Sequence, residues 1–304
     1  MTTRATVPGP RGAGVRQRDL LAWARERLRG LEGANPSQEA RLLLEWALGV
    51  DSLWTAPEAV GAHAAERFRC AVAQRRARVP LQHITGRMWF RGLEMIARPG
   101  VFVVRPETEV VAGVAIDAAC TLRPTDEDAR LHLVDLCTGS GAIALSLAHE
   151  IPFCEVVAVE IDRDAVALAR DNVAACEERG EIPRGSVRVE QGDATSALGD
   201  LDGAVDLVVA NPPYVPGTQI PTQAEALRDP RAALYGGGED GLVVPRGIVH
   251  RAAALLRPGG VLVVEHAESQ ARAMRAIARA EGFTDIGTGP DLTGRDRMLV
   301  ARGA

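Results

Sequence analysis

The sequence Val205-Asp206-Leu207-Val208-Val209-Ala210-Asn211-Pro212-Pro213-Tyr214 joins an apolar run to two consecutive prolines. The apolar run is typical of a buried strand, and the prolines end it abruptly. Asn211 therefore stands at the carboxyl end of a strand, where open α/β sheets form their ligand crevice. A strand that simply ends in a turn is the plainer interpretation of an Asn-Pro pair taken alone.

The polar groups of this segment suit a planar nitrogen group. The Asn211 side-chain carbonyl and the Pro212 backbone carbonyl are adjacent acceptors, and the proline nitrogen carries no competing donor. Two neighbouring acceptors match the two hydrogens of an amino or amide group, and Tyr214 offers a ring face against its plane. The segment is thus a candidate site for holding an amine or an amide.

A second predicted strand, Leu131 to Leu136, leads into a glycine-containing loop upstream of this segment. The loop is Asp135-Leu136-Cys137-Thr138-Gly139-Ser140-Gly141, and a helix is predicted from Ala142. Glycines at a helix N-terminus allow the backbone to approach a ligand closely, but the third glycine of the dinucleotide fingerprint is missing. Asp135 would repel a pyrophosphate, so we expect a cationic or amine-bearing ligand, such as the methionine part of S-adenosylmethionine.

Two further predicted strands end near acidic residues. Val156 to Val159 leads to Glu160, whose carboxylate can accept both hydroxyl groups of a ribose. Val187 to Glu190 leads to Gly192-Asp193-Ala194, where the Asp193 carboxylate can meet an adenine amino group. The ordered set of a glycine loop, two acids and Asn-Pro-Pro-Tyr is more specific than any of its members.

The remainder of the back half completes an α/β pattern. Helices are predicted at residues 164–177, 246–256 and 268–281, and strands at 261–265, 283–286 and 298–301. The long stretch between Val215 and Val244 contains three consecutive glycines and is predicted to be a loop. We expect this loop to form a lid or a wall of the substrate site.

The front of the chain is predicted to be a separate helical module. Helices are expected from Asp19, from Asn35-Pro36 with proline at the first helical position, and from Pro57. Residues 80–86 break the helical pattern, and residues 88–90 and 93–96 are expected to form a hairpin. The predicted boundaries are a flexible tail at 1–18, a helical recognition domain at 19–83, a hairpin linker at 84–104 and an α/β domain at 105–304.

Composition restricts the class of protein further. All 35 basic residues are arginine; residues 1–95 hold 15 of them against 9 acids, whereas residues 96–304 hold 20 against 31. The basic front could meet an acidic or RNA-containing partner, or it could be a solvated helical surface. The five cysteines lack a C-x-x-C spacing, and no apolar stretch is long enough to cross a membrane, so we expect a cytoplasmic protein. The six histidines lack the spacing of metal ligands, so we expect no metal site.

Together these motifs resemble the HemK-type glutamine methyltransferases that modify peptide-chain release factors. Asn-Pro-Pro-Tyr alone is shared with DNA adenine methyltransferases, whereas the helical front and Arg105-Pro106-Glu107-Thr108-Glu109 select the release-factor branch. Two departures are Asp229-Pro230, where the family has Glu-Pro, and Glu265-His266-Ala267, where glycine is commoner at the third position. The second departure puts the local loop geometry in question. The stretches that carry the resemblance are residues 80–86, 105–109, 135–141, 211–214, 239–242, 258–260 and 291–297.

The resemblance implies a class I S-adenosylmethionine-dependent methyltransferase fold, an α/β fold with a Rossmann-like seven-stranded sheet, in residues 105–304. It implies S-adenosylmethionine as the methyl donor and the Gln of a Gly-Gly-Gln loop in a release factor as the acceptor. A nucleic-acid substrate and an association with a membrane are not expected. Carried over to this chain, the cofactor residues are Cys137, Thr138, Gly139, Ser140, Gly141, Glu160, Asp193, Ala194 and Asn211. The substrate residues are Asn211, Pro212, Pro213 and Tyr214, and the catalytic residues among them are Asn211, Pro212 and Tyr214.

Three rival functions stay open at this point. A DNA or RNA adenine methyltransferase could hold an exocyclic amine with the same acceptors after base flipping, but it should carry a basic surface by the site, and residues 96–304 are acidic overall. A binding module of the same fold without turnover is disfavoured by the intact Asn211, Pro212 and Tyr214. A nicotinamide oxidoreductase is disfavoured by the missing glycine.

Overall fold

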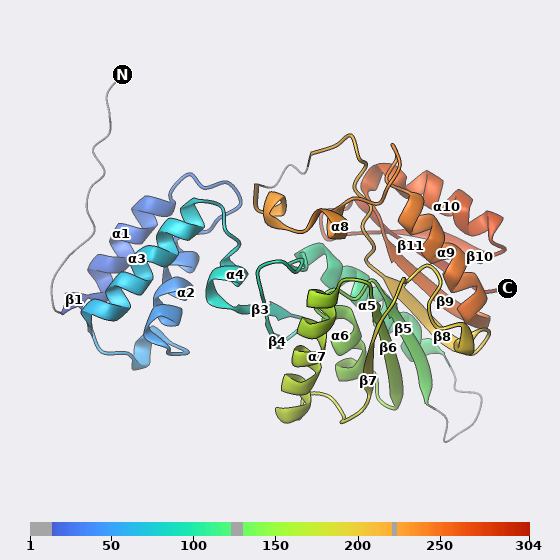
Figure 1. Ribbon diagram of the computed structural model, residues 1–304, viewed down its shortest axis with the longest axis horizontal. Helices are drawn as coiled ribbons and strands as arrows, with labels where there is room; N and C mark the ends of the chain where they lie inside the picture. The colour runs from blue at the N-terminus through green and yellow to red at the C-terminus, as the bar shows by residue number, and fades with distance from the viewer. Residues whose placement is uncertain (1–13, 123–129, 221–223) are drawn as a thin grey trace. The chain divides into compact units, whose positions relative to one another are not determined.

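The computed structural model describes residues 14–122, 130–220 and 224–304 of the chain. These residues form two compact units, which divide between Gly86 and Arg87 (Figure 1). Most of the predicted tail, residues 1–13, lies outside the described residues, as do residues 221–223 of the predicted lid or wall.

The first unit is a small bundle of helices with a two-stranded ribbon. Local sequence sets both ends of its second helix: the Asn35 side chain accepts a hydrogen bond from the Gln38 amide at 3.2 Å, and Gly49 closes the helix with φ of 69°. The elements are β1 (Val15–Arg16), α1 (Gln17–Leu28), α2 (Pro36–Leu48), the 3-10 helix η1 (Leu53–Thr55), β2 (Ala59–Val60), α3 (Ala62–Arg76) and α4 (Leu81–Thr85).

An apolar core and one buried ion pair hold this unit together. Arg75 of α3 donates from Nε to Glu39 Oε2 at 2.7 Å and from Nη2 to Glu39 Oε1 at 3.2 Å, so the pair is bidentate and joins α3 to α2. Only 6% of the Arg75 side chain and 11% of the Glu39 side chain are exposed. The fully buried apolar residues of this unit include Leu20, Leu28, Leu43, Leu44 and Phe68.

The structure corrects three expectations for this part of the chain. The tail predicted to reach residue 18 is shorter, because Val15–Arg16 pairs with Ala59–Val60 and α1 begins at Gln17. The same pairing makes residues 59–60 a strand, so α3 begins at Ala62 and not near Pro57. Residues 80–86, predicted to break the helical pattern, form the one-turn helix α4, whose C-cap Gly86 has φ of 73°.

The second unit is built on a seven-stranded sheet and carries a separate hairpin (Figure 1). Its strands are β3 (Arg87–Phe90) and β4 (Leu93–Ile96) in the hairpin, and β5 (Leu131–Leu136), β6 (Cys154–Glu160), β7 (Val187–Gln191), β8 (Val205–Ala210), β9 (Leu256–Glu265), β10 (Thr284–Pro290) and β11 (Asp296–Arg302) in the sheet. Its helices are α5 (Pro106–Thr121), α6 (Ala142–Glu150), α7 (Arg163–Glu178), α8 (Arg231–Leu234), α9 (Val243–Leu255) and α10 (Ala271–Ala280), with 3-10 helices η2 (Gly199–Leu201), η3 (Ala224–Arg228) and η4 (Glu268–Gln270).

The strand order of the sheet is β10-β11-β9-β8-β5-β6-β7. Strands β5 to β9 are parallel to one another, whereas β11 runs antiparallel to both β9 and β10. From β5 the chain adds β6 and β7 on one side and β8 and β9 on the other. The order therefore reverses between β5 and β8, and such a switch point opens a crevice at the carboxyl ends of the strands.

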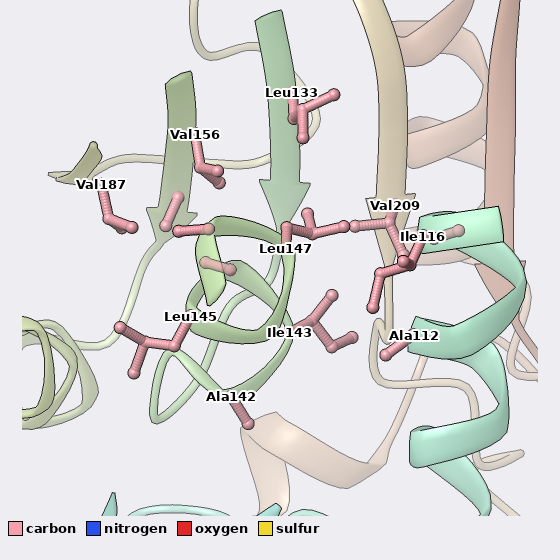
Figure 2. Close-up of a cluster of buried hydrophobic side chains, with 14 of the residues drawn as sticks. Ala112, Ile116, Leu133, Ala142, Ile143, Leu145, Leu147, Val156, Val187 and Val209 are labelled. Atoms are coloured by element: carbon pink, nitrogen blue, oxygen red, sulfur yellow. The ribbon is translucent and has the colours of Figure 1, made fainter. Parts of the chain in front are cut away.

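Helices cover both faces of the sheet, so the unit has three layers. Helices α5, α6 and α7 supply the core on one face, and α9 and α10 supply it on the other. Figure 2 shows the first of these cores, in which Ile143 and Leu147 of α6 cluster with Ile116 of α5 and Val209 of β8. Strand β8, in the middle of the sheet, is buried along its whole length, as is typical of a strand covered on both faces.

Two expectations for the second unit also need correction. The hairpin predicted as a linker packs on this unit: the Ile96 amide donates to Asn172 Oδ1 of α7 at 2.7 Å, and Phe90 and Leu93 are buried in the α5–α6 core. The turn predicted at residues 258–260 is instead an irregularity inside β9, where the register against β8 shifts between Val205 and Leu207.

No described helix is long and apolar enough to cross a membrane. No three His, Cys, Asp or Glu side chains of the described residues gather in a way that could hold a metal ion. All five cysteines are free thiols.

Candidate active site

A cavity of about 880 Å³ is lined by residues from the carboxyl ends of the strands, on both sides of the switch point between β5 and β8. Its volume falls in the range of small-molecule sites, roughly 300–1,000 Å³. The fold thus collects in one place residues that the sequence distributes over four strand ends. The predicted site residues that line the cavity are Cys137, Gly139, Glu160, Asp193, Ala194, Asn211, Pro212, Pro213 and Tyr214.

Left-handed backbone geometry shapes the loop after β5. Cys137, Gly139 and Gly141 have φ of 63°, 58° and 87°. Three predicted cofactor residues, Thr138, Ser140 and Gly141, are absent from the cavity lining among the described residues. Thr138 and Ser140 are buried, and Gly141 is the N-cap of α6. These three residues lie behind the cavity wall, where they hold the shape of the loop.

Asp135 lies inside the loop rather than on the cavity. Its side chain is fully buried, and Oδ2 accepts hydrogen bonds from Thr138 Oγ1 at 2.5 Å and from the Ala144 amide at 3.1 Å. Burial raises the pKa of Asp135 to about 7, against the opposing effect of the Thr138 hydroxyl. The expectation that Asp135 faces the ligand is therefore wrong: its two hydrogen bonds join β5, the loop and α6.

Glu160 at the end of β6 is well placed to accept hydrogen bonds from a nucleoside. Its Oε1 accepts from the amides of Ile161 and Asp162 at 2.8 and 2.9 Å, and its Oε2 accepts from the Gly139 amide at 2.8 Å. An ionised carboxylate offers about four lone-pair directions. Glu160 can therefore hold the glycine loop against β6 and still receive a hydroxyl group from the cavity.

Asp193 follows β7 and stays anionic. Its Oδ1 accepts from the Thr195 hydroxyl at 2.7 Å and from the Thr195 amide at 2.9 Å. These two hydrogen bonds lower the pKa of Asp193, with the hydroxyl contributing most. With Ala194 beside it on the cavity wall, Asp193 can accept a hydrogen bond from an amino group of a ligand.

The segment Asn211–Tyr214 is joined by hydrogen bonds to α5 and β9. Asn211 Nδ2 donates to Thr108 Oγ1 at 3.1 Å, and Thr108 Oγ1 donates to Glu265 Oε2 at 2.8 Å. The Tyr214 hydroxyl donates to the other oxygen of the same carboxylate, Glu265 Oε1, at 3.0 Å. Within the described part of the chain, Asn211 Oδ1 and the Pro212 carbonyl accept no hydrogen bond, so two acceptors remain for a ligand in the cavity.

The Glu265 carboxylate is almost completely buried, with 1% of the residue exposed. Burial raises the pKa of Glu265 to about 7, while the donors Thr108 and Tyr214 and the charge of Arg297 act in the opposite direction. Burial and the neighbouring Glu265 raise the pKa of Tyr214, so its hydroxyl stays protonated and donates. Because these effects oppose one another, Glu265 changes between its protonated and ionised forms near pH 7.

The backbone of the same segment is packed against the glycine-rich stretch that follows it. Gln270 Nε2 donates to the carbonyls of Tyr214 and Asp240, both at 2.8 Å. A Cβ on Gly241 would lie 2.3 Å from the Tyr214 carbonyl oxygen, and a Cβ on Gly236 would lie 2.0 Å from the Gly241 carbonyl oxygen. No larger residue fits at either position without a backbone shift. The stretch predicted as a lid or wall supports Asn-Pro-Pro-Tyr and lines one side of the cavity.

The two departures from the family pattern keep the local structure intact. Asp229, in the place of the usual glutamate, forms a buried ion pair with Arg105 at the start of α5. Ala267 has φ of −68°, an ordinary extended conformation that needs no glycine. The loop geometry that the sequence put in question is therefore compatible with alanine.

Several residues that shape the site are not identified by sequence reasoning. Glu265, Arg297 and Phe102 line the cavity, and Gln270 holds the backbone behind it. Glu265 could have been found, because it ends the predicted strand that neighbours β8, and the carboxyl ends of parallel strands meet at one edge of the sheet. Arg297 belongs to an antiparallel strand, and no rule from the sequence places it there.

The strand order, the antiparallel β11 and the site at the switch point define a class I S-adenosylmethionine-dependent methyltransferase. A methyltransferase from Pyrococcus furiosus has a similar fold, with a TM-score of 0.52 and 19% identity over 76% of this chain and 100% of that one. The catalytic domain of hMettl16, solved in complex with a hairpin of the MAT2A 3′UTR, also has a TM-score of 0.52, with 14% identity over 79% and 81% of the two chains. At these identities the likeness concerns the fold.

Within this class, the chain belongs to the release factor glutamine methyltransferase family. The model of the PrmC N-terminal domain matches residues 19–86, and that of the methyltransferase small domain matches residues 93–248. The release factor glutamine methyltransferase of Streptomyces coelicolor is 45% identical over 93% of this chain and 97% of its own length. That of Bifidobacterium longum is 41% identical over 93% and 98%.

One relative carries a different acceptor in its name. The 4-amino-L-phenylalanine/4-methylamino-L-phenylalanine methyltransferase of Streptomyces pristinaespiralis is 40% identical over 71% of this chain and 70% of its own length. The nitrogen of an aromatic amine, like that of a carboxamide, is conjugated with a neighbouring unsaturated carbon. An aromatic amine is therefore an alternative acceptor that must be compared with a release factor when the substrate is tested.

Replacing Glu160 by glutamine is expected to weaken cofactor binding. The variant loses the negative charge that is predicted to receive a ribose hydroxyl. Hydrogen bonds to charged groups contribute about 1.5–3 kcal/mol, so Kd for S-adenosylmethionine should rise roughly 10–150-fold. Titration calorimetry measures the change. Glu155→Gln on the same strand is the matched control, because its half-exposed carboxylate pairs with Arg130 and does not line the described cavity. Equal Kd values for Glu160→Gln and the control would contradict this role.

Proposed function

We propose that this protein transfers a methyl group from S-adenosylmethionine to the side-chain amide nitrogen of the Gln in the Gly-Gly-Gln loop of a peptide-chain release factor. The observation that carries the proposal is the pair of acceptors left at the end of β8. Asn211 Oδ1 and the Pro212 carbonyl face no donor in the described chain, and they match the two N–H bonds of a primary carboxamide. Tyr214 would cover the plane of that amide.

The acceptor nitrogen is a weak nucleophile, because its lone pair is delocalised into the carbonyl group. Two hydrogen bonds, to Asn211 and Pro212, orient the nitrogen and favour some pyramidal character, which returns electron density to the lone pair. When bound, S-adenosylmethionine supplies an electrophilic methyl group on a positively charged sulfur. Positioning the two reactants can lower the barrier by up to roughly 7–11 kcal/mol.

The atoms and charges balance without a dedicated base. Transfer would form one nitrogen–carbon bond and break one carbon–sulfur bond, so that the donor would depart as a neutral thioether and the acceptor nitrogen would release one proton. The Asn211 and Pro212 oxygens already hold the two hydrogens, so the departing proton starts from one of these contacts. The positive charge on sulfur is lost during the reaction, so exclusion of water from the site favours the transfer.

We assign the cofactor to the side of the cavity formed by Cys137, Gly139, Glu160, Asp193 and Ala194. Glu160 would accept a ribose hydroxyl, and Asp193 would accept a hydrogen bond from the adenine amino group. Thr138, Ser140 and Gly141 would act through the shape of the loop. These assignments are supported by the anionic acceptors on this side of the cavity and by its volume.

We further propose that the helical unit recognises the release factor and that the reaction takes place in the cytoplasm, where translation terminates. The helical unit contains a cavity of about 400 Å³ lined by Trp23, Arg27, Arg69 and Arg76 together with small apolar residues. Trp23 Nε1 and Arg69 Nε are buried there and have no hydrogen-bond partner within the described residues. Donors and positive charge around one cavity suit an anionic group of the partner.

Reversing one charge at this second cavity is expected to weaken recognition of the protein substrate. Arg76→Glu should raise KM for the release factor at least about tenfold, because the loss of one hydrogen bond to a charged group weakens binding by about this factor. The Kd for S-adenosylmethionine should not change. Arg25→Glu is the control, since Arg25 is an exposed residue of α1 and does not line this cavity. Equal KM values for the two variants would contradict a recognition role for the cavity.

The overall function is tested by transfer of a labelled methyl group from S-adenosylmethionine. Purified release factor, the same factor with its Gly-Gly-Gln glutamine replaced by alanine, DNA and 4-amino-L-phenylalanine are offered in parallel. We expect label only on the release factor that keeps the glutamine of its Gly-Gly-Gln loop. Label on DNA would favour the adenine methyltransferase, and label on the aromatic amine would favour the activity named for the Streptomyces pristinaespiralis relative.

A further inference from the structure

The hydrogen bonds behind Asn211 can run in one direction only while Glu265 is ionised. A carboxylate has no hydrogen to donate, so Thr108 Oγ1, at 2.8 Å from Glu265 Oε2, must direct its single proton toward Glu265. The Thr108 oxygen can then only accept on its other side. The Asn211 atom at 3.1 Å from it must therefore be the nitrogen Nδ2.

The opposite orientation of the Asn211 amide is disfavoured by the same contacts. Turning the amide over would place Oδ1 against the Thr108 oxygen, so that two acceptors would meet without a hydrogen between them. Thr108 is fully buried, and water therefore has little access to relieve this contact. The orientation that presents Oδ1 to the cavity is thus set by Thr108 and, through Thr108, by Glu265.

We propose that Thr108 and Glu265 are positioning residues, which fix the Asn211 side chain with its oxygen toward the methyl acceptor and, through the second oxygen of Glu265, hold Tyr214 beside it. This inference rests on the proposed function, because it assigns the Asn211 oxygen to the acceptor's N–H group. One buried carboxylate thereby orders both polar side chains of the Asn-Pro-Pro-Tyr segment.

The direction of this relay depends on the proton of Glu265. The charged or titratable groups that face Glu265 are Glu107 on α5, Tyr214 after β8 and Arg297 on β11. Burial raises the pKa of Glu265 to about 7, Glu107 adds to this effect, and Arg297 and the two hydroxyl donors oppose it. A protonated Glu265 can donate to Thr108, which then donates to Asn211 Oδ1 and turns the amide nitrogen toward the substrate. The kcat for methyl transfer should therefore reach its maximum above about pH 7 and decrease as the pH drops through this value.

The test compares two changes at Thr108. Thr108→Val keeps the shape of the side chain but removes the hydroxyl group, and kcat for methyl transfer should fall about 100-fold, as expected for a misplaced reacting group. Thr108→Ser restores the hydroxyl group and should recover most of that loss. Kd for S-adenosylmethionine should stay within about twofold of the wild-type value in both variants, since an uncharged contact outside the cofactor side contributes little to it. Thr121→Val, the same change at the exposed end of α5, is the matched control.

A third variant separates positioning from a general packing defect. Glu265→Gln cannot ionise, so the decline of kcat below about pH 7 should disappear between roughly pH 6 and 8.5, at a reduced plateau. Wild-type kcat in Thr108→Val would overturn the proposal. A pH profile of Glu265→Gln that keeps the wild-type decline would overturn it as well, as would a Thr108→Ser variant as slow as Thr108→Val.

A substrate-free measurement distinguishes failure of this inference from failure of the proposed function. The chain contains only three asparagines, so the Asn211 side-chain NH₂ resonance can be assigned by its loss in Asn211→Ala. We expect one strongly shifted, slowly exchanging NH₂ proton in the wild type and its loss in Thr108→Val. An unshifted wild-type resonance would refute the relay even if the release factor is methylated. A shifted resonance together with an unmethylated release factor would refute the proposed substrate and leave the relay standing.

Discussion

Asn211→Ala is expected to lower kcat for methyl transfer about 10³-fold. Removing one hydrogen-bonding group that acts on the reacting atoms costs roughly 10²–10³-fold in other enzymes, and alanine here also removes the partner of the Thr108 hydroxyl. Single-turnover transfer of labelled methyl to the acceptor measures the loss. Because Asn211 also lines the cofactor cavity, Kd for S-adenosylmethionine should change, but by no more than about tenfold, the value of one neutral hydrogen bond.

The control for this variant is Gln219→Ala. Gln219 carries the same amide group, is exposed, and belongs to the stretch that follows Asn-Pro-Pro-Tyr without lining the described cavity. Its loss should leave both kcat and the cofactor affinity at the wild-type level. An Asn211→Ala enzyme that transfers methyl at the wild-type rate would remove the main support for the proposed function, because no other described side chain offers the same acceptor at the end of β8.

Glu39→Gln is expected to destabilise the helical unit by about 3–5 kcal/mol. The change removes the negative charge that pairs with the buried Arg75 guanidinium, and breaking a buried ion pair at one partner costs this amount in other proteins. Urea unfolding followed by tryptophan fluorescence suits the measurement. Trp23 and Trp46 are half-buried in the helical unit, whereas Trp54 and Trp89 are 96% and 65% exposed and should report little.

The matched control is Glu26→Gln. Glu26 pairs with Arg29 at 2.9 Å on the surface of α1, with 66% of its side chain exposed, and surface pairs contribute only about 0–1 kcal/mol. If the helical unit recognises the release factor, Glu39→Gln should also lose transfer to that factor under mild denaturing conditions while it still binds S-adenosylmethionine. Equal unfolding midpoints for Glu39→Gln and Glu26→Gln would show that the buried pair is not needed for stability.

Much of the secondary structure could be predicted because its signals are local. The bounds of β5, Leu131–Leu136, follow from an apolar run that ends in a glycine loop, and the caps of α2 follow from Asn35 and Gly49. The predictions that are wrong involve segments whose state depends on distant partners. Residues 59–60 form a strand only because Val15–Arg16 lies beside them, and β9 continues through Pro258 because β8 tolerates a shift in register.

The candidate site divides along the same line. Asn211, Glu160 and Asp193 could be placed together from the sequence, since each follows a strand of one parallel sheet and such ends converge. The partners that orient Asn211 could not be placed, because Thr108 lies 103 positions away from it on a helix, and Glu265 lies 51 positions from Tyr214. The charge of Asp135 predicts a ligand contact, but the packing encloses its side chain within the loop.

Local sequence signals are enough to define the strand ends, the glycine loop and the residue types that can hold a carboxamide beside a nucleoside. These features depend on short-range chemistry: proline ends a strand, glycine permits left-handed geometry, and a carboxylate accepts. The direction of the Asn211 amide and the strength with which Glu265 holds its proton become visible only in the folded protein. Both depend on burial and on donors that the fold brings together from α5, β9 and β11, and no local pattern records such contacts.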